Sequence, residues 1–307
     1  MKLGPCISLP VRAERTIRCG ILGGAVLTAL ILVPGLSLAD GLTWRTDYCH
    51  AKAEASQARR NLCVFFRDPV RNPSLSQLDT TLAELETQNC ISQRFVFADL
   101  PLSASIERDG LPQRLLNQPA FAELNHAPGL AILDLSDPAS RTFGCVVSVY
   151  PFPPGEQVPP AHLSALLNLP PGSLTQRTLI LAVRIHSESP RSTAGEFSPL
   201  LSEEAEHHSR HQANITLQGH HQWESRFHRI NAKLPNSLLA QEVCAESWPG
   251  QGLLAAALEC VHSWRQSPGH WEAVRTGHPL FAYDMARGRN GVWYATGIFA
   301  RRDGAGH

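Results

Sequence analysis

The chain has 307 residues, which is enough for one large domain or two domains of ordinary size. With 43% hydrophobic and 18% charged residues it can bury a core, which excludes disordered and collagen-like proteins. Lys and Arg number 27 against 27 Asp and Glu, so no overall basic field indicates a nucleic-acid partner. Five of the six tryptophans follow residue 220, and nine of the fourteen histidines lie between His207 and His278, so we expect the functional site in the last third of the chain.

Residues 1–39 have the pattern of a secretory signal peptide. Basic residues between Lys2 and Arg18 precede an apolar segment at 21–33, and Ser37-Leu38-Ala39 forms a small-x-small cleavage site. The apolar segment is short for a membrane-spanning helix, which needs roughly 20 residues, although an uncleaved anchor is the alternative. We therefore expect an extracytoplasmic (periplasmic or secreted) protein that contacts a membrane only if the signal segment stays attached.

Six cysteines follow the signal segment: Cys49, Cys63, Cys90, Cys145, Cys244 and Cys260. An exported protein can form disulfides, but six cysteines allow fifteen complete pairings and the sequence does not choose among them. No Cys-x-x-Cys spacing occurs, which counts against zinc ribbons and dithiol redox chemistry.

A proline-rich stretch at 152–172 divides the rest of the chain. Its prolines remove backbone donors and fix φ, so it is predicted to be an extended linker. We therefore expect one domain at 40–151, a second at 173–302, and a short tail at 303–307.

Helix and strand patterns alternate in the first domain. A helix is predicted from Trp44 to Arg59, then a buried strand at 62–66, and then a helix that a capping box opens at Ser74. Further strands are predicted at 95–98, 130–133 and 145–149. Strands that are separated by helices imply a sheet with crossover connections.

This order of elements resembles a thioredoxin-like domain. The resemblance is carried by Trp44-Arg45 before an alanine-rich helix, by the strands 62–66 and 95–98, and by Pro128, where that fold has a cis-proline. The redox motif would follow Phe66, where residues 67–72 contain no thiol. The resemblance therefore implies a scaffold for packing or binding, and we expect no thiol–disulfide oxidoreductase activity.

The second domain opens with an apolar segment at 177–183 that fits either a helix or a strand. A helix is predicted from Ser202 as N-cap to about residue 217, with His208 in its buried face. A second helix carries a buried stripe over 253–264 and ends just before His270. The chain closes with a hairpin in which Asn290-Gly291 indicates a type I′ turn.

Five stretches of this domain together resemble the bacterial form of the CAP superfamily of secreted proteins (cysteine-rich secretory, antigen 5 and pathogenesis-related types). They are Ala205–Ala213, Gly219-His220, Glu242–Ala245, Trp264–His270 and Trp293–Phe299. The resemblance implies an α-β-α sandwich over 173–302. Val243 replaces the asparagine of the family's glutamate motif and Thr296-Gly297 replace its last glutamine, which weakens the implication of catalysis more than that of the fold.

In that family, histidines and glutamates face each other in a cleft. The candidate cleft residues here are His220, His221, Glu242, Glu246, His270 and Trp293. His220, Glu242 and His270 are the candidate metal set, since imidazoles and a carboxylate can hold a divalent cation such as zinc and leave a position for a ligand. His221 and Glu246 are competing assignments, and the alternative for the histidines is that they cap the C-terminal ends of helices.

Three functions are compatible with these patterns. The first is an exported cell-envelope or secreted protein whose cleft binds a small apolar or amphipathic molecule, an envelope component or a divalent metal. The second is a metal-dependent hydrolase that uses the same residues, and the third is a non-catalytic interaction module. We expect binding rather than catalysis, no cofactor beyond such a metal, and no nucleic-acid partner.

Overall fold

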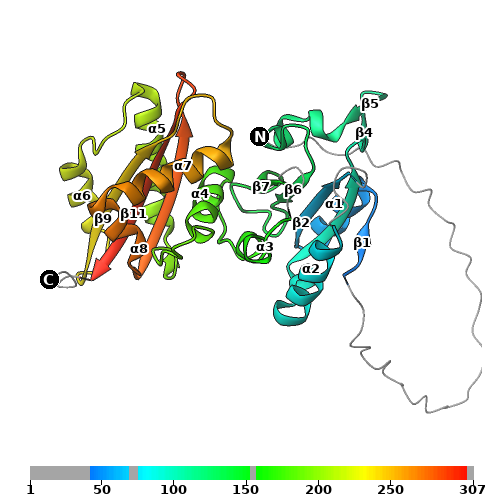
Figure 1. The fold of residues 1–307 in the computed structure, drawn as a ribbon, viewed down its shortest axis with the longest axis horizontal. Helices are drawn as coiled ribbons and strands as arrows, with labels where there is room; N and C mark the ends of the chain where they lie inside the picture. The colour runs from blue at the N-terminus through cyan, green and yellow to red at the C-terminus, as the bar shows by residue number, and fades with distance from the viewer. Residues whose placement is uncertain (1–41, 69–74, 153–156, 303–307) are drawn as a thin grey trace, which may run out of the picture.

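The computed structural model describes residues 42–68, 75–152 and 157–302, which form two lobes that lie side by side (Figure 1). The architecture is mixed α/β, in agreement with the expected fold class. The signal segment, the Ser74 end of the capping box and the tail at 303–307 lie outside the described residues.

The first lobe is built on a five-stranded sheet with the order β1-β3-β2-β6-β7. These strands are β1 (Trp44–Arg45), β2 (Asn61–Arg67), β3 (Phe95–Pro101), β6 (Gly129–Leu133) and β7 (Val146–Pro151). β1, β3 and β2 run parallel, whereas β6 is antiparallel to β2 and β7 is antiparallel to β6. Residues 62–66 of the central strand β2 are fully buried, which explains their unbroken apolar sequence.

Helices and a small hairpin complete this lobe: α1 (Tyr48–Gln57), α2 (Leu75–Asn89), the hairpin strands β4 (Ser105–Arg108) and β5 (Leu111–Arg114), and the 3₁₀ turns η1 (Ile91–Gln93), η2 (Leu115–Asn117) and η3 (Pro119–Leu124). The prediction that a helix begins at Trp44 is wrong, because Trp44 and Arg45 pair with β3. The helix starts after Asp47, whose side chain accepts a hydrogen bond from the His50 amide. No peptide bond in the described ranges is cis, so Pro128 departs from the expected cis-proline.

Part of the predicted linker at 152–172 is a packed helix. α3 (Pro160–Leu167) begins with a proline, which the first helical position tolerates because no backbone donor is lost there. Leu163, Leu166 and Leu167 are buried, and Arg94 of the first lobe donates to the Leu167 carbonyl. An extended linker would have left these leucines exposed.

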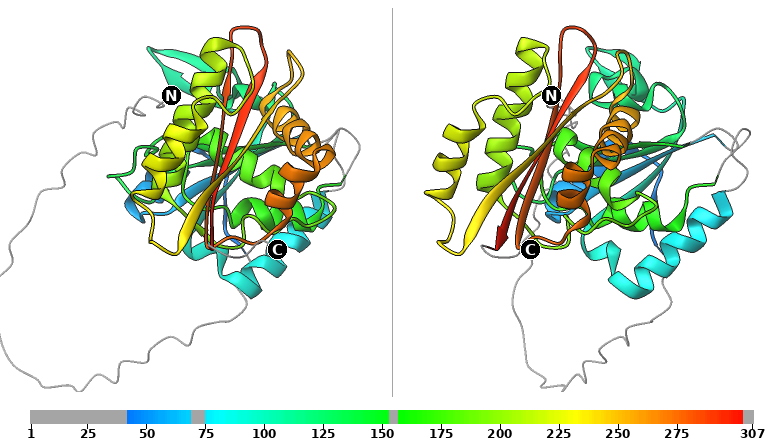
Figure 2. Two further views of the ribbon diagram at one scale, coloured as in Figure 1. Left: turned by 90° about the vertical axis from the view of Figure 1, so that its left-hand side faces the viewer. Right: turned by 60° about the vertical axis from the view of Figure 1, so that its left-hand side comes forward.

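The second lobe is a four-stranded sheet with helices on both faces (Figure 2). Its strands, in sheet order, are β8 (Glu196–Phe197), β10 (Leu280–Arg287), β11 (Trp293–Arg302) and β9 (Leu238–Glu246). One face is covered by α5 (Pro199–Ile215) and α6 (Trp223–Asn231), and the other by α4 (Leu174–Arg184), α7 (Leu253–Gln266) and α8 (Pro268–Arg275). β9 is therefore an edge strand between two helical layers.

Local details of this lobe differ from the sequence predictions. α5 begins four residues earlier than predicted, with Ser198 as N-cap and Pro199 at the first helical position, so Ser202 lies inside the helix. The ambiguous segment at 177–183 is helical. The hairpin loop spans 288–292, and of these residues only Gly291 has a positive φ, +77°, so a type I′ turn is excluded because it needs two such residues.

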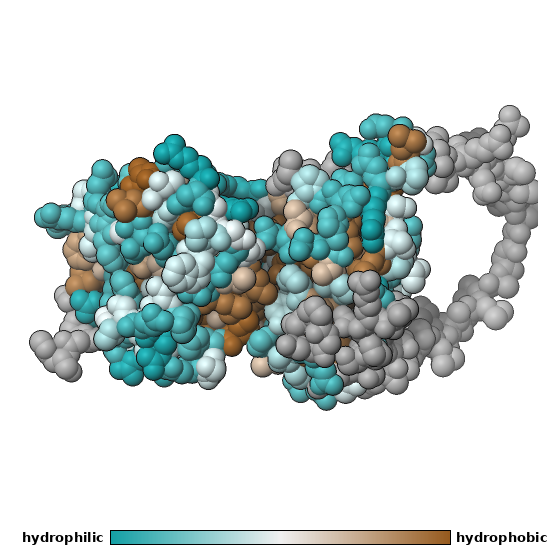
Figure 3. Space-filling model, turned by 45° about the horizontal axis from the view of Figure 1, so that its top comes forward, coloured by the Kyte–Doolittle hydropathy of each residue, from teal (hydrophilic) through white to brown (hydrophobic). Residues whose placement is uncertain are grey.

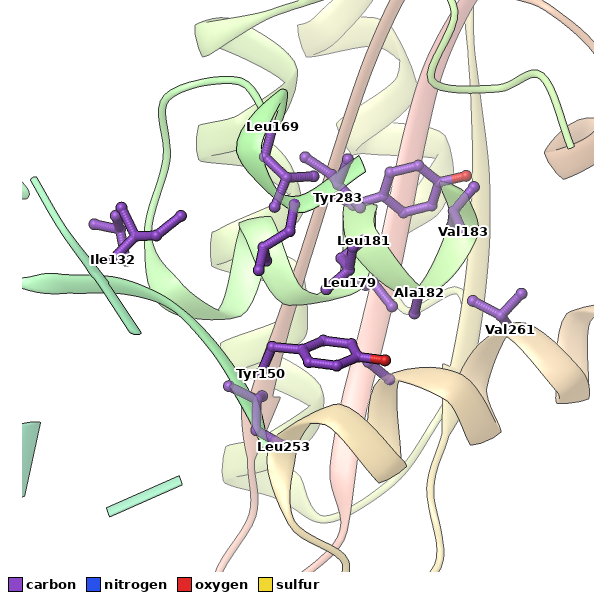
Figure 4. Packing of buried hydrophobic residues seen from close by; sticks show 14 of the residues in the cluster. Ile132, Tyr150, Leu169, Leu179, Leu181, Ala182, Val183, Leu253, Val261 and Tyr283 are labelled. Atoms are coloured by element: carbon purple, nitrogen blue, oxygen red, sulfur yellow. The ribbon is translucent and has the colours of Figure 1, made fainter. Parts of the chain in front are cut away.

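One hydrophobic core continues from the first lobe into the second. Figure 4 shows part of it: Ile132, Tyr150, Leu169, Leu179, Leu181, Ala182, Val183, Leu253, Val261 and Tyr283. Apolar residues also show on the surface where the two lobes meet (Figure 3).

Polar contacts join the lobes beside this core. The buried guanidinium of Arg177 donates to Ser148 Oγ at 2.8 Å and to the carbonyls of Leu169 and Pro170 at 3.1 and 2.7 Å. Burial lowers the pKa of Arg177 to about 10, so the side chain is still charged at neutral pH. These contacts hold β7 against the N-terminal half of α4.

Candidate functional site

The site is built around a buried carboxylate on edge strand β9. Side chains alternate along a strand, so Val243 and Ala245 pack toward α7, while Ala240 and Glu242 face the layer of α5 and α6. Glu242 is only 7% exposed. A buried carboxylate is costly unless it is paired and hydrogen-bonded.

Arg226 and His220 supply those partners. Arg226 of α6 binds both carboxylate oxygens of Glu242, with Nη2 donating to Oε1 at 2.8 Å and Nη1 donating to Oε2. Nδ1 of His220 lies 2.9 Å from Oε1. Burial alone would raise the pKa of Glu242, but the hydrogen bonds from His220 and Arg226 outweigh it, so the net pKa lies below its ordinary value.

These contacts fix the tautomer of His220. An ionised carboxylate only accepts hydrogen bonds, so His220 donates from Nδ1 and its Nε2 carries the lone pair. That Nε2 lies 3.2 Å from Nε2 of His270, which comes from α8 in the opposite helical layer, so the two imidazoles meet beside the outer edge of β9. Burial lowers the pKa of His270, which keeps it neutral at pH 7.

The capping alternative for the two histidines is wrong. His270 lies in the first turn of α8, not at the C-terminal end of a helix. His220 lies in the loop between α5 and α6, and its Nδ1 binds Glu242 rather than a helix carbonyl.

Two more buried groups support this arrangement. His208 of α5 donates from Nε2 to the Gly219 carbonyl at 2.9 Å, which fixes the loop that carries His220. Burial lowers the pKa of His208 to about 4. Sγ of Cys244 lies 3.8 Å from His220 Nδ1, and burial raises the pKa of this thiol well above its ordinary value.

The ligand atoms of His208, Glu242 and Cys244 lie within 4.8 Å of one another, which suggests a buried metal site. The bonds already made argue against this interpretation. Both oxygens of Glu242 are bound by Arg226, and Nε2 of His208 carries the proton that it donates to a carbonyl. A guanidinium in direct contact would also repel a cation. We therefore interpret these three residues as side chains that hold His220 in position, not as metal ligands.

Three predicted residues do not join this group. His221 points its Nε2 at the Leu217 carbonyl, 3.2 Å away. Glu246 is exposed and lies roughly 13 Å along β9 from Glu242. Trp293 is buried in the layer of α7, where its indole N–H donates to the Gln251 carbonyl. Of the predicted set, the structure brings together His220, Glu242 and His270.

A cleft of about 1060 Å³ opens beside His220 and Glu242. Much of its wall is made of small or apolar residues: Ala194, Gly195, Trp223, Ala240, Ala273, Gly277 and Pro279. Its charged residues include Arg191, Arg301, Arg302 and Glu272. His220 therefore borders a space that is large enough for a small molecule, and His270 contacts the site through His220.

No sequence pattern predicted Arg226, the partner that binds both oxygens of Glu242. It lies in a polar helix three residues after Trp223, and its guanidinium is 5.2 Å from that ring. Surface helices show the same pattern, so no local signal marked this arginine as buried.

The comparisons with known proteins assign the chain to no family. No family model matches the chain, and no curated protein matches it. Among solved structures, an outer surface protein from Borrelia burgdorferi is similar over 36% of this chain and 78% of that chain, with 19% sequence identity and a TM-score of 0.29. A TM-score this low carries no argument about fold or function. In the described ranges, no helix combines the length and apolar character needed to cross a membrane.

Proposed function

We propose that this is an extracytoplasmic small-ligand-binding protein whose cleft holds a divalent metal ion, zinc, between His220 and His270. The observation that carries the proposal is the 3.2 Å separation of their Nε2 atoms. Two nitrogen ligands of a tetrahedral zinc ion, each bound at roughly 2.0–2.1 Å, lie about 3.3 Å apart. The bound metal would act as a Lewis acid that attracts an anionic or carbonyl group of the ligand.

In this proposal Glu242 orients the metal-binding imidazole of His220 and does not bind the metal itself. Its oxygens are held by Arg226 and His220, so it matches the carboxylate that fixes a metal-binding histidine from behind. This changes the predicted metal set, in which Glu242 was a direct ligand.

We retain the two family resemblances within this proposal. The strand order β1-β3-β2-β6-β7, with only β6 and β7 antiparallel to their neighbours, supports a thioredoxin-like first lobe. The three layers of the second lobe, with His220 and His270 meeting beside β9, support a CAP-like arrangement. The signal-peptide pattern at 1–39 supports an extracytoplasmic location.

Binding is favoured over hydrolysis by the state of Glu242. A general base must be able to take a proton from an attacking water. Glu242 is 1% exposed at its side chain, both of its oxygens accept hydrogen bonds, and its pKa lies below the ordinary value, so it is a weak base.

Zinc titration of the purified chain from residue 40 onward, followed by calorimetry and metal analysis, tests the proposal. We expect one zinc ion per chain and at least a hundredfold weaker binding in His270→Ala and His220→Ala. Glu242→Gln should weaken binding about 10- to 100-fold, as expected for a carboxylate behind a histidine ligand. His262→Ala on α7, an exposed histidine that bonds Gln266, is the matched control and should bind zinc normally. Zinc retained by a His220→Ala/His270→Ala double variant would overturn the proposal.

A further inference from the structure

The cleft carries positive charge that the histidine site does not use. Arg191 lies before β8, and Arg301 and Arg302 end β11. Among the described residues, no carboxylate lies within ion-pair distance of these three arginines.

The acidic residues of the cleft do not offset this charge. Glu242 is neutralised by Arg226, and Glu272 by Arg275, which lies one helical turn away. The three arginines therefore leave this wall with an excess of positive charge, although the chain as a whole has equal numbers of basic and acidic residues.

Arg191 and Arg301 approach the same short stretch of the wall. The Arg191 backbone is fixed by its hydrogen bond to the Arg275 carbonyl, and its guanidinium lies 4.0 Å from the position that a Cβ on Gly277 would take. His278, the next residue, is buried and stacks on Phe299 with ring centroids 4.5 Å apart. Arg301 lies two residues after Phe299 on β11, so both side chains leave the same face of the sheet, and Arg301 and His278 both line the cleft.

The cleft wall beside these guanidiniums contains glycines and alanines. A Cβ on Gly195 would lie 2.0 Å from the His278 carbonyl oxygen, so only glycine lets these two segments approach so closely. Gly277 likewise places no side chain in front of Arg191. Ala194 and Ala273, which also line the cleft, have small side chains. These small residues leave room for a ligand group beside the Arg191 guanidinium.

We propose that Arg191 and Arg301 bind the phosphate group of a small phosphorylated ligand whose remaining part extends along the cleft toward His220. A phosphate monoester carries a charge of about −1.5 to −2 at pH 7 and three acceptor oxygens, which suits two or more guanidiniums. One arginine is enough for a carboxylate. The proposal deepens the proposed function, because it names the ligand class of the same cleft, but it does not depend on the metal.

The test is calorimetry of the purified chain in metal-free buffer with glycerol 3-phosphate, and co-sedimentation with phosphatidic acid vesicles or phosphatidylcholine vesicles. Binding of glycerol 3-phosphate identifies a soluble ligand. Binding of phosphatidic acid vesicles alone identifies a lipid headgroup, and both outcomes support phosphate recognition. Arg191→Gln/Arg301→Gln should weaken the binding at least tenfold. Arg289→Gln, an exposed arginine in the hairpin loop, is the control and should bind as the wild type does.

Three outcomes would overturn the proposal: no binding to either probe, undiminished binding by Arg191→Gln/Arg301→Gln, or equal binding of acetate and glycerol 3-phosphate. Zinc titration of the same variant separates the two proposals. If the phosphate proposal alone is wrong, zinc still binds and the probes do not. If the zinc proposal alone is wrong, phosphate binding persists in the wild type and in His270→Ala.

Discussion

The two lobes differ in one kind of contact: among the ion pairs of the described residues, only pairs formed by Glu242, in the second lobe, have both side chains buried. In the first lobe, ion pairs such as Arg45–Glu54 and Arg67–Asp79 include at least one partner that is a quarter or more exposed. In the second lobe, the Glu242 and Arg226 side chains are 1% and 7% exposed. Buried ion pairs seldom improve stability over apolar packing, so one that is kept beside a cleft points to function. This buried pair lies in the second lobe, next to the proposed site.

The largest expected effect is from breaking the buried pair. Arg226→Met leaves the Glu242 carboxylate buried without a counter-charge, which should cost about 3–5 kcal/mol of unfolding free energy. Urea unfolding at pH 7 measures this loss. The double variant Arg226→Met/Glu242→Gln should recover most of it, because the uncompensated charge is gone.

Arg265→Met is the matched control for that experiment. Arg265 of α7 also binds a glutamate, Glu188, but both side chains are about half exposed, at 47% and 45%. The loss of this pair should lower the unfolding free energy far less, because solvent screens exposed charges. Equal losses in Arg226→Met and Arg265→Met would show that burial of the Glu242 carboxylate does not set the cost.

The second effect concerns the contact between the lobes. Arg177→Met removes three hydrogen bonds from a charged donor and should cost about 2–4 kcal/mol. Limited proteolysis should then cut between residues 157 and 172 faster than in the wild type. Arg184→Met, from the end of the same helix, loses its contacts with the Asn168 carbonyl and Thr193 and should show a smaller change. A wild-type chain cut first within 157–172 would contradict the packed α3.

Some features could be read from the sequence because their cause is local. The unbroken apolar run at 62–66 marked the central strand, and the spacing of buried residues marked α7. α4 stayed ambiguous because residues 176–183 are all buried, so no polar face reveals a helical period. α3 was hidden because prolines both break helices and begin them.

Only part of the site could be predicted, because the rest depends on contacts between segments that are distant in the sequence. His220, Glu242 and His270 were found because their surrounding motifs resemble a known family. Arg226 was not found, because its burial depends on Glu242 of strand β9, which lies 16 residues further along the chain. Glu246 and Glu242 both lie on β9, and only the packing of α6 over the strand distinguishes them.

The third effect depends on pH and again belongs to the second lobe. The pKa of His208 is about 4 in the folded protein and 6.5 ordinarily, so the unfolded chain binds more protons between these values. The contribution of His208 to the free energy of unfolding is complete above pH 6.5 and decreases as the pH falls toward 4. At pH 5 the loss is about 2 kcal/mol. Between pH 7 and 5, His208→Gln should therefore lose less stability than the wild type, as measured by thermal unfolding.

The glutamine amide can still donate to the Gly219 carbonyl, so His208→Gln keeps the contact and removes the titration. Burial raises the pKa of Asp284 to about 6, which acts in the opposite direction in both proteins, so the difference between the two isolates His208. His228→Gln, an exposed position on α6, should behave as the wild type does. Parallel pH curves for His208→Gln and the wild type would contradict the assignment.

The smallest effect is expected from the thiols of the first lobe. Disulfide exchange needs an accessible thiolate of low pKa. Cys63 lies in the centre of β2 with no exposed surface, and burial raises its pKa well above the ordinary value, whereas Cys90 is exposed after α2. In the reduced native protein, a thiol reagent should therefore label Cys90 readily and Cys63 only after unfolding. Insulin reduction should stay at background in the wild type and in Cys63→Ala. Turnover that is lost in Cys63→Ala would place chemistry in the first lobe and reverse the comparison between the lobes.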